Sequence, residues 1–350
     1  MTVGSPTGLL DRLVEVGVLE AERAAELAAA PSTPWWLAAL QGFAAWVASF
    51  LIMSSFFAPL MFLGEGPVGR GIAGAALLAA AVWLFRRGHA FTAQMALAFS
   101  LAGQALVVGA FAGDFDASVN FRMLSLVGLL VAAGMFVAPA TQLHRVVCAL
   151  LMTGHLGYLI GPGNPLALYA VALAAAAVAA WLVRRRWPAR RAQTIRALVH
   201  AVTLGALVVA VIVGTQAARN LGISPGATPV LNPVIYPAGI GLLLLGAVTW
   251  LGRNESSAFR LGSLGGALLF VVAAWRAPGL MASAAVLLAV FHAGHRAWAA
   301  LALLAAMIYL GEFYYSLHAT LLAKSGALAA TGLVLLGLRL GLGMWDRGRP

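Results

Sequence analysis

The sequence has almost no cysteine and little charge. Cys148 is the only cysteine in 350 residues and lies within an apolar run, so the chain forms neither a disulfide framework nor a thiolate zinc cluster. Only 9% of the residues are charged, well below the roughly one quarter that is usual in soluble domains. With 62% hydrophobic residues, the chain has too little polar surface to stay dissolved in water. We therefore expect lipid to be its solvent.

The sequence also lacks the motifs of common metal and nucleotide sites. It contains no H-E-x-x-H zinc motif, no phosphate-binding Walker loop, and no pair of carboxylates at helical spacing inside an apolar segment. The net charge of +11 comes from arginines that punctuate apolar segments, not from a basic face of the kind that binds nucleic acid. These absences predict no cofactor, no metal and no nucleic-acid partner, and they favour a protein other than an enzyme.

Residues 1–34 form the only segment that resembles a soluble protein. Apolar residues including Leu9, Leu13 and Val16 stand at helical spacing until Gly17 ends the pattern. Glu20 and Glu22 then open a second short helix, where negative charge suits the helix N-terminus. The segment lacks the basic start of a secretory signal, so we expect no cleavage. It predicts a cytoplasmic arm of two amphipathic helices.

Twelve apolar stretches follow the arm, each of about the length that a helix needs to cross a bilayer. They lie at residues 35–63, 69–85, 90–112, 122–138, 144–161, 165–183, 195–215, 230–251, 259–275, 278–292, 296–313 and 320–340. They predict an all-α fold, a polytopic transmembrane helix bundle of about 12 spans. The transmembrane domain covers residues 35–340, and residues 341–350 form a cytoplasmic tail.

The distribution of basic residues predicts the orientation of these spans. With the N-terminus in the cytoplasm, 17 of the 22 arginine and lysine residues fall in inner segments and 5 in outer ones. This bias follows the positive-inside rule. An error of one span would destroy the alternation between inner segments rich in basic residues and outer segments with few. We therefore expect both termini in the cytoplasm.

Three predicted spans end in the same type of tetrad on the cytoplasmic side. The tetrads are Trp83-Leu84-Phe85-Arg86, Trp181-Leu182-Val183-Arg184 and Trp250-Leu251-Gly252-Arg253. The first and third close spans two and eight, as a parallel repeat of six plus six spans, divided by the basic loop 184–196, would require. The alternative is the ordinary preference for tryptophan at the interface and arginine just inside it.

The last predicted hairpin carries a family resemblance. It contains Gly311-Glu312-Phe313-Tyr314-Tyr315-Ser316-Leu317 and then Thr320-Leu321-Leu322-Ala323-Lys324-Ser325, before a final span rich in glycine and leucine. With the length and span pattern, this resembles the bacterial membrane-protein family catalogued as domain of unknown function 4401. Members are often encoded beside another polytopic membrane protein and a small protein named for a Gly-Asp-Tyr motif. The resemblance implies an inner-membrane protein with other membrane proteins as partners, and it supplies no reaction.

Glu312 and Lys324 form the sharpest predicted pair. Both should lie near the outer ends of the last two spans, where an unpaired charge in hydrocarbon costs at least about 2.5 kcal/mol. We expect their side chains within about 6 Å of each other. Lys324 is the only lysine, and an ammonium can lose its proton when desolvated, so the pair would suit proton coupling. The alternative is a structural clamp, with Tyr315 as an interface anchor.

Two further polar groups are candidates for a path through the membrane. Asn232 lies in the proline-rich segment 225–237, which predicts either a broken helix of the kind that forms transporter sites or an outer loop that folds back over the protein. His155 shares one side of the fifth span with His144 and Cys148. No carboxylate accompanies these three residues, so the spacing favours packing over metal binding. Gln104 in the third span is expected to act as interhelical glue.

Two functions lead, and an intramembrane enzyme is a third, less favoured one. The first is a membrane scaffold or complex subunit, which binds other membrane proteins and docks a partner through the arm. The second is a secondary transporter or ion-coupled carrier of unknown substrate, with Glu312, Lys324, Asn232 and His155 on its path. A carrier predicts a hydrated cavity that reaches the middle of the bilayer, whereas a scaffold predicts a dry core.

Overall fold

The computed structural model describes residues 6–17, 19–29, 34–63, 66–111, 117–138, 140–184, 187, 192–212 and 231–316. Apart from one isolated β-bridge between Gly163 and Leu231, all regular structure in these ranges is helical. The helices are α1 (Pro6–Glu15), α2 (Ala21–Ala29), α3 (Trp35–Leu63), α4 (Pro67–Phe85), α5 (Ala90–Ala110), α6 (Ala117–Val137), α7 (Gln142–Ile160), α8 (Asn164–Leu182), α9 (Ala192–Ile212), α11 (Ile235–Leu251), the 3-10 turn η3 (Gly252–Asn254), α12 (Ser257–Ala273), α13 (Pro278–His292) and α14 (Arg296–Ser316).

Each of the first eleven predicted spans coincides with one of the helices α3 to α14, and the ends agree within a few residues. Six of the described helices, α4, α5, α7, α8, α9 and α11, are long and apolar enough to cross a membrane. The predicted span at residues 320–340 lies outside the described residues. The all-helical fold is therefore confirmed for the described chain, while the twelve-span count and the orientation stay predictions.

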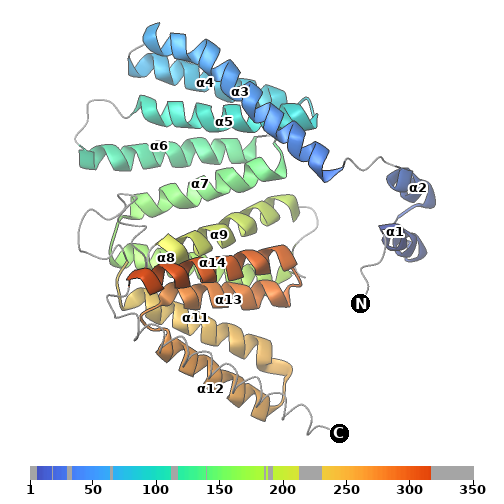
Figure 1. Ribbon diagram of the computed structural model, residues 1–350, viewed down its shortest axis with the longest axis vertical. Helices are drawn as coiled ribbons and strands as arrows, with labels where there is room; N and C mark the ends of the chain where they lie inside the picture. Colours follow the sequence, from blue (N-terminus) through green and yellow to red (C-terminus); the bar gives the residue numbers. More distant parts are fainter. Residues whose placement is uncertain are drawn as a thin grey trace.

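The apolar helices lie side by side in one elongated stack, with α3 and α4 at one end and α11 and α12 at the other (Figure 1). Several of them begin with proline in the first turn, namely Pro67 in α4, Pro165 in α8 and Pro278 in α13. An amide in the first turn has no partner within the helix, so proline costs nothing there and fixes the helical φ angle. These prolines start helices and do not break them.

The stack contains two apolar cores. The smaller one joins α4, α5, α6 and α7 around Leu77, Phe99 and Met135. The larger one joins α8, α9, α11, α13 and α14, and much of it is alanine and valine, with Trp181, Ile240 and Met281 among its largest buried residues. Small side chains let helix backbones approach closely, which is how helices associate in lipid. The sixth predicted span, α8, packs in the larger core, so the two cores do not divide at the basic loop 184–196.

The arm forms a two-helix hairpin, as the sequence predicts. Gly17 adopts the left-handed conformation with a φ of 71°, and its amide donates to the Val14 carbonyl oxygen at 2.9 Å. The turn brings α2 back along α1, where Ala24 is buried. The hairpin stands apart from the stack, next to the start of α3 (Figure 1).

Candidate functional site

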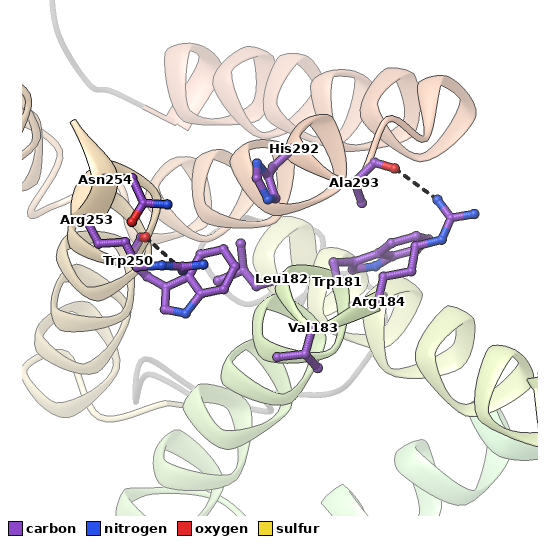
Figure 2. Close-up of a pocket in the computed structure, with 9 residues that line it drawn as sticks. All are labelled: Trp181, Leu182, Val183, Arg184, Trp250, Arg253, Asn254, His292 and Ala293. Carbon is purple, nitrogen blue, oxygen red and sulfur yellow. Dashed lines mark hydrogen bonds between the residues drawn. The ribbon is translucent and has the colours of Figure 1, made fainter. Parts of the chain in front are cut away.

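A cavity of about 630 Å³ opens beside the C-terminal ends of α8, α11 and α13 (Figure 2). We call it the arginine cavity. The chain leaves α8 and α11 through the second and third tetrads found in the sequence, so the tetrads supply two of its walls. The lining residues are Trp181, Leu182, Val183, Arg184, Trp250, Arg253, Asn254, His292 and Ala293.

The wall from α11 holds an arginine on a tryptophan. The Arg253 guanidinium carbon lies 3.8 Å from the centroid of the Trp250 ring, within cation–π range. Its Nη1 donates to the Trp250 carbonyl oxygen at 3.1 Å, which satisfies a carbonyl at the end of α11. The His292 ring meets the same indole at nearly a right angle, with the centroids 5.7 Å apart. The guanidinium is therefore held in place by two contacts.

The wall from α8 is built in a similar way. The Arg184 guanidinium carbon lies 5.7 Å from the Trp181 ring centroid, and its Nη1 donates to the Ala293 carbonyl oxygen at 3.0 Å. This hydrogen bond ties the end of α8 to the end of α13. Trp181 is buried, and its Nε1 donates to the Thr203 hydroxyl at 2.9 Å. A buried indole N–H needs such a partner, so the ring is fixed in orientation.

The arginine cavity is positively charged. Both guanidinium groups are exposed, and none of the lining residues is acidic. Glu255 follows η3 in the chain but is not a lining residue. Among the described residues the one ion pair joins Arg23 and Glu26 in the arm, so neither cavity arginine has a carboxylate partner within that part of the chain. Within the described residues, the two cations thus have no counter-charge.

The first tetrad has the stacking geometry without the cavity. Arg87, which follows the tetrad, lies with its guanidinium carbon 4.3 Å from the Trp83 ring centroid, and Trp83 is exposed on α4. Its residues do not line the arginine cavity. All three tetrads could therefore be recognised in the sequence, but the sequence did not indicate which two would line the same cavity.

Asn232 lies at the opposite end of α11, outside the helix. Its Oδ1 accepts hydrogen bonds from the amides of Val234 and Ile235 at 2.8 and 3.0 Å, which caps α11, and its Nδ2 donates to Asn164 Oδ1 at 2.7 Å. Helix α11 runs without a break from Ile235 to Leu251. With Tyr236, Asn232 lines a second cavity of about 390 Å³. The described part of segment 225–237 is thus a cap and an unbroken helix start.

His155 has a different environment. It is half-buried on α7, and its imidazole ring lies against the backbone of Gly128 on α6, where a Cβ atom would overlap it. Asn232, by contrast, donates a hydrogen bond to Asn164 at the start of α8. A role for either residue in a polar path stays a prediction.

Several predicted residues lie outside what the structure describes. The backbones of Glu312 and Tyr315 belong to α14, but their side chains and all of Lys324 are outside the described residues. The pairing of Glu312 with Lys324 therefore stays a prediction. Residues 222–226, Gly-Ile-Ser-Pro-Gly, match the G-x-S-x-G pattern of hydrolase nucleophiles and also lie outside. That pattern needs a strand before it and a helix after it, and the described residues contain no strand of a sheet.

Sequence reasoning found His144, Cys148 and Gln104 but missed that they meet, with Ser100, in one buried polar network between α5 and α7. The Ser100 hydroxyl and His144 Nε2 lie 2.8 Å apart, and Gln104 Nε2 donates to the Ser100 hydroxyl at 3.0 Å. Cys148 Sγ lies 3.5 Å from His144 Nε2 and 3.8 Å from Gln104 Nε2. All four side chains are buried. The described residues hold no group of three His, Cys, Asp or Glu that could bind a metal, and the network joins two helices.

The arm carries a groove of its own. A cavity of about 410 Å³ lies between α1 and α2, and we call it the arm groove. Leu10, Val14 and four alanines provide its apolar surface, and two acidic residues, Asp11 and Glu15, also line it. Asp11 and Glu15 are exposed and stand about one helical turn apart, so they give the groove an acidic rim.

The fold and these sites define an all-helical protein with several helices able to cross a membrane. A family model described as domain of unknown function (DUF4401) matches residues 34–343, and the chain belongs to this family. The resemblance seen in the last hairpin is thereby confirmed. No curated protein and no solved structure matches the chain. The arm lies almost entirely outside the matched residues.

Proposed function

We propose that this protein is a scaffold subunit of a bacterial inner-membrane complex. Its apolar helices hold it in the bilayer, and its arm docks a partner protein at the cytoplasmic surface. The observation that carries the proposal is the arm groove, which combines an apolar floor with an acidic rim on a hairpin that stands apart from the stack. A small hairpin with an open groove suits a binding element better than a structural one.

The chemistry of the arm groove favours a basic amphipathic helix as its occupant. Leu10, Val14 and Ala24 offer an apolar strip to the apolar face of such a helix. The carboxylates of Asp11 and Glu15 then face lysine or arginine on its flank, and opposite charges steer association and fix its register. The partner is thus expected to present a short basic helix at the membrane surface.

The charge of the arm also keeps it available. Residues 1–34 contain five acidic and two basic residues, whereas the rest of the chain is strongly basic. The cytoplasmic leaflet carries anionic lipid, which attracts polybasic segments and repels acidic ones. The arm is therefore held off the lipid surface and remains free to bind a protein.

A secondary transporter or ion-coupled carrier is the alternative function. It is favoured by the two cavities at opposite ends of α11 and α13. Between these ends the same helices pack through Ile240, Ala285 and Val286, which are almost completely buried. No aspartate, glutamate, lysine or arginine is buried in the described part of the chain. This absence of buried charge among the described residues supports the scaffold over the carrier.

The test compares two matched pairs of neutral substitutions. Asp11→Asn with Glu15→Gln removes the acidic rim, while Glu20→Gln with Glu22→Gln removes the same charge from exposed positions that do not line the groove. Each tagged full-length protein is extracted in mild detergent, and the co-purifying membrane proteins are quantified by mass spectrometry. We expect the rim variant to lose about tenfold in recovery of one partner with a basic helical segment, and the control to keep it.

The outcomes separate the two functions. Equal recovery by both variants would exclude the arm groove as the docking site. A protein that purifies without any partner, yet catalyses uptake of a solute in vesicles, would instead support the carrier.

A further inference from the structure

We propose that the arginine cavity binds a phosphate group, carried either by an anionic phospholipid headgroup or by a soluble phosphorylated compound. This inference goes beyond the scaffold function, because it concerns the ends of α8, α11 and α13 and not the arm, and it needs no partner protein. It rests on four features of the cavity: two cations, their fixed positions, the absence of a counter-charge among the lining residues, and the available volume.

The donors are present and only partly used. Each guanidinium has five N–H groups in a planar fork that matches the oxygens of a phosphate. Arg184 is seen to donate to Ala293 and Arg253 to Trp250, one carbonyl each. Further N–H groups on both arginines therefore remain for a ligand. His292 and the amide of Asn254 add polar groups to the same lining.

The positions of the two cations are set before any ligand arrives. Arg253 is stacked on Trp250, and Arg184 lies near the ring of Trp181, which is itself anchored to Thr203. A side chain that is already ordered loses less conformational entropy when it binds. Figure 2 shows the two arginines on opposite sides of the site, with His292 between them. The lining thus offers N–H donors on two walls of the cavity.

Helix capping alone does not account for this arrangement. Arginine at a helix end commonly binds the last carbonyl groups, and each cavity arginine does so. Capping explains neither the space of about 630 Å³ nor the presence of two arginine–tryptophan pairs in its lining. That volume lies within the range of about 300–1,000 Å³ that small-molecule sites occupy. Basic pockets between helices at the cytoplasmic side are also where acidic lipid headgroups bind.

The first tetrad supplies a control within the same chain. Arg87 is stacked on Trp83, as Arg253 is stacked on Trp250, but it is exposed just after the end of α4 and does not line the cavity. Removing its charge changes the electrostatics of the surface without changing the cavity. A site-specific effect must therefore distinguish Arg87→Gln from the double variant Arg184→Gln with Arg253→Gln.

The experiment measures ligand binding to the full-length protein in neutral detergent. Phosphatidylglycerol and phosphatidylcholine are added as lipid probes, and glycerol 3-phosphate and inorganic phosphate as soluble probes. Bound lipid is counted by native mass spectrometry, and the thermal midpoint is followed for all four probes. We expect one phosphatidylglycerol to bind the native protein and Arg87→Gln, and its affinity for the double glutamine variant to fall about tenfold or more.

The probes and variants decide whether the site exists and which kind of phosphate compound it binds. Stabilisation by glycerol 3-phosphate but not by phosphatidylglycerol would assign the site to a soluble phosphorylated compound. Arg184→Lys with Arg253→Lys keeps the charge and guards against misfolding, and it should show intermediate affinity because it lacks the planar fork. Failure of all four probes to bind, or equal loss in Arg87→Gln, would overturn the proposal.

Discussion

The imidazole ring of His155 lies directly against the backbone of Gly128 on the neighbouring helix. A methyl group at position 128 would overlap this ring, and a packed site relieves an overlap only by moving a side chain or a helix. We expect Gly128→Ala to destabilise the protein by about 1–3 kcal/mol. The measurement is the thermal unfolding midpoint of the purified protein in mild detergent.

Two further variants separate this contact from a general effect of the methyl group. Gly134→Ala adds the same group to an exposed position of α6 with no atom within 4 Å, and should leave the midpoint nearly unchanged. His155→Ala in the Gly128→Ala background should restore part of the loss, because the overlapped ring is gone. A normal midpoint for Gly128→Ala alone would show that the ring and the glycine do not touch.

Single residues also show how far the sequence predicts a site. His144 and Cys148 contact each other, as their four-residue spacing on a helix predicts. Their network also includes Ser100, which lies 44 residues before His144 in the chain. Helical periodicity indicates which face of a helix is apolar, but not which helix it will meet. The polar residues could therefore be found, whereas their partners could not.

At the scale of the element, the backbones of helices α4 and α5 approach each other closely at Gly74 and Gly103. A Cβ atom on Gly74 would lie 2.8 Å from the backbone nitrogen of Val107, and one on Gly103 would lie 2.9 Å from the carbonyl oxygen of Gly74. Backbone cannot rotate away as a side chain can. We expect Gly74→Ala to lower the thermal midpoint in detergent by separating the two helices.

Position 71 on the same helix provides the matched control for this crossing. A Cβ atom on Gly71 would meet the Ala110 Cβ atom at 3.6 Å, an ordinary contact. Gly71→Ala should therefore be neutral or mildly stabilising, because alanine favours the helix more than glycine does. If both variants shifted the midpoint equally, the effect would come from helix propensity and not from the close crossing.

Elements were easier to predict than single contacts. An apolar run of sufficient length has only one stable form in lipid, the helix, so the described helices follow directly from composition. The start of α11 shows where this logic ends. The apolar run begins at residue 230, but the helix begins at Ile235, because Asn232 caps it and Pro233 lies in the turn before it. A hydropathy pattern does not contain such a cap.

At the scale of the whole molecule, the distribution of basic residues predicts the topology. Reporter fusions after Arg191 and after Pro350 should both show a cytoplasmic location, and a fusion after Asp116 should show a periplasmic one. Alkaline phosphatase and green fluorescent protein fusions provide the two opposite signals. A cytoplasmic signal at Asp116 would contradict the twelve-span topology.

The arginine cavity is a property of the whole molecule that the sequence could not predict. The three tetrads are visible in the sequence, where they fit either an internal repeat or the preferences of a helix end at the membrane surface. Only the packing of α8, α11 and α13 brings two of them to one cavity and leaves the third on an exposed face. One sequence carries no record of such contacts between distant segments.

The scaffold function is tested most directly by cross-linking through the arm groove in living cells. A photo-activatable amino acid replaces Ala28, which lines the groove, or Glu22, which is exposed outside it. After irradiation we expect Ala28 to cross-link to one membrane-associated protein, through a basic amphipathic segment, and Glu22 to give little of that product. Cross-links from Ala28 only to this chain itself, or the same products from both positions, would contradict the proposed docking role.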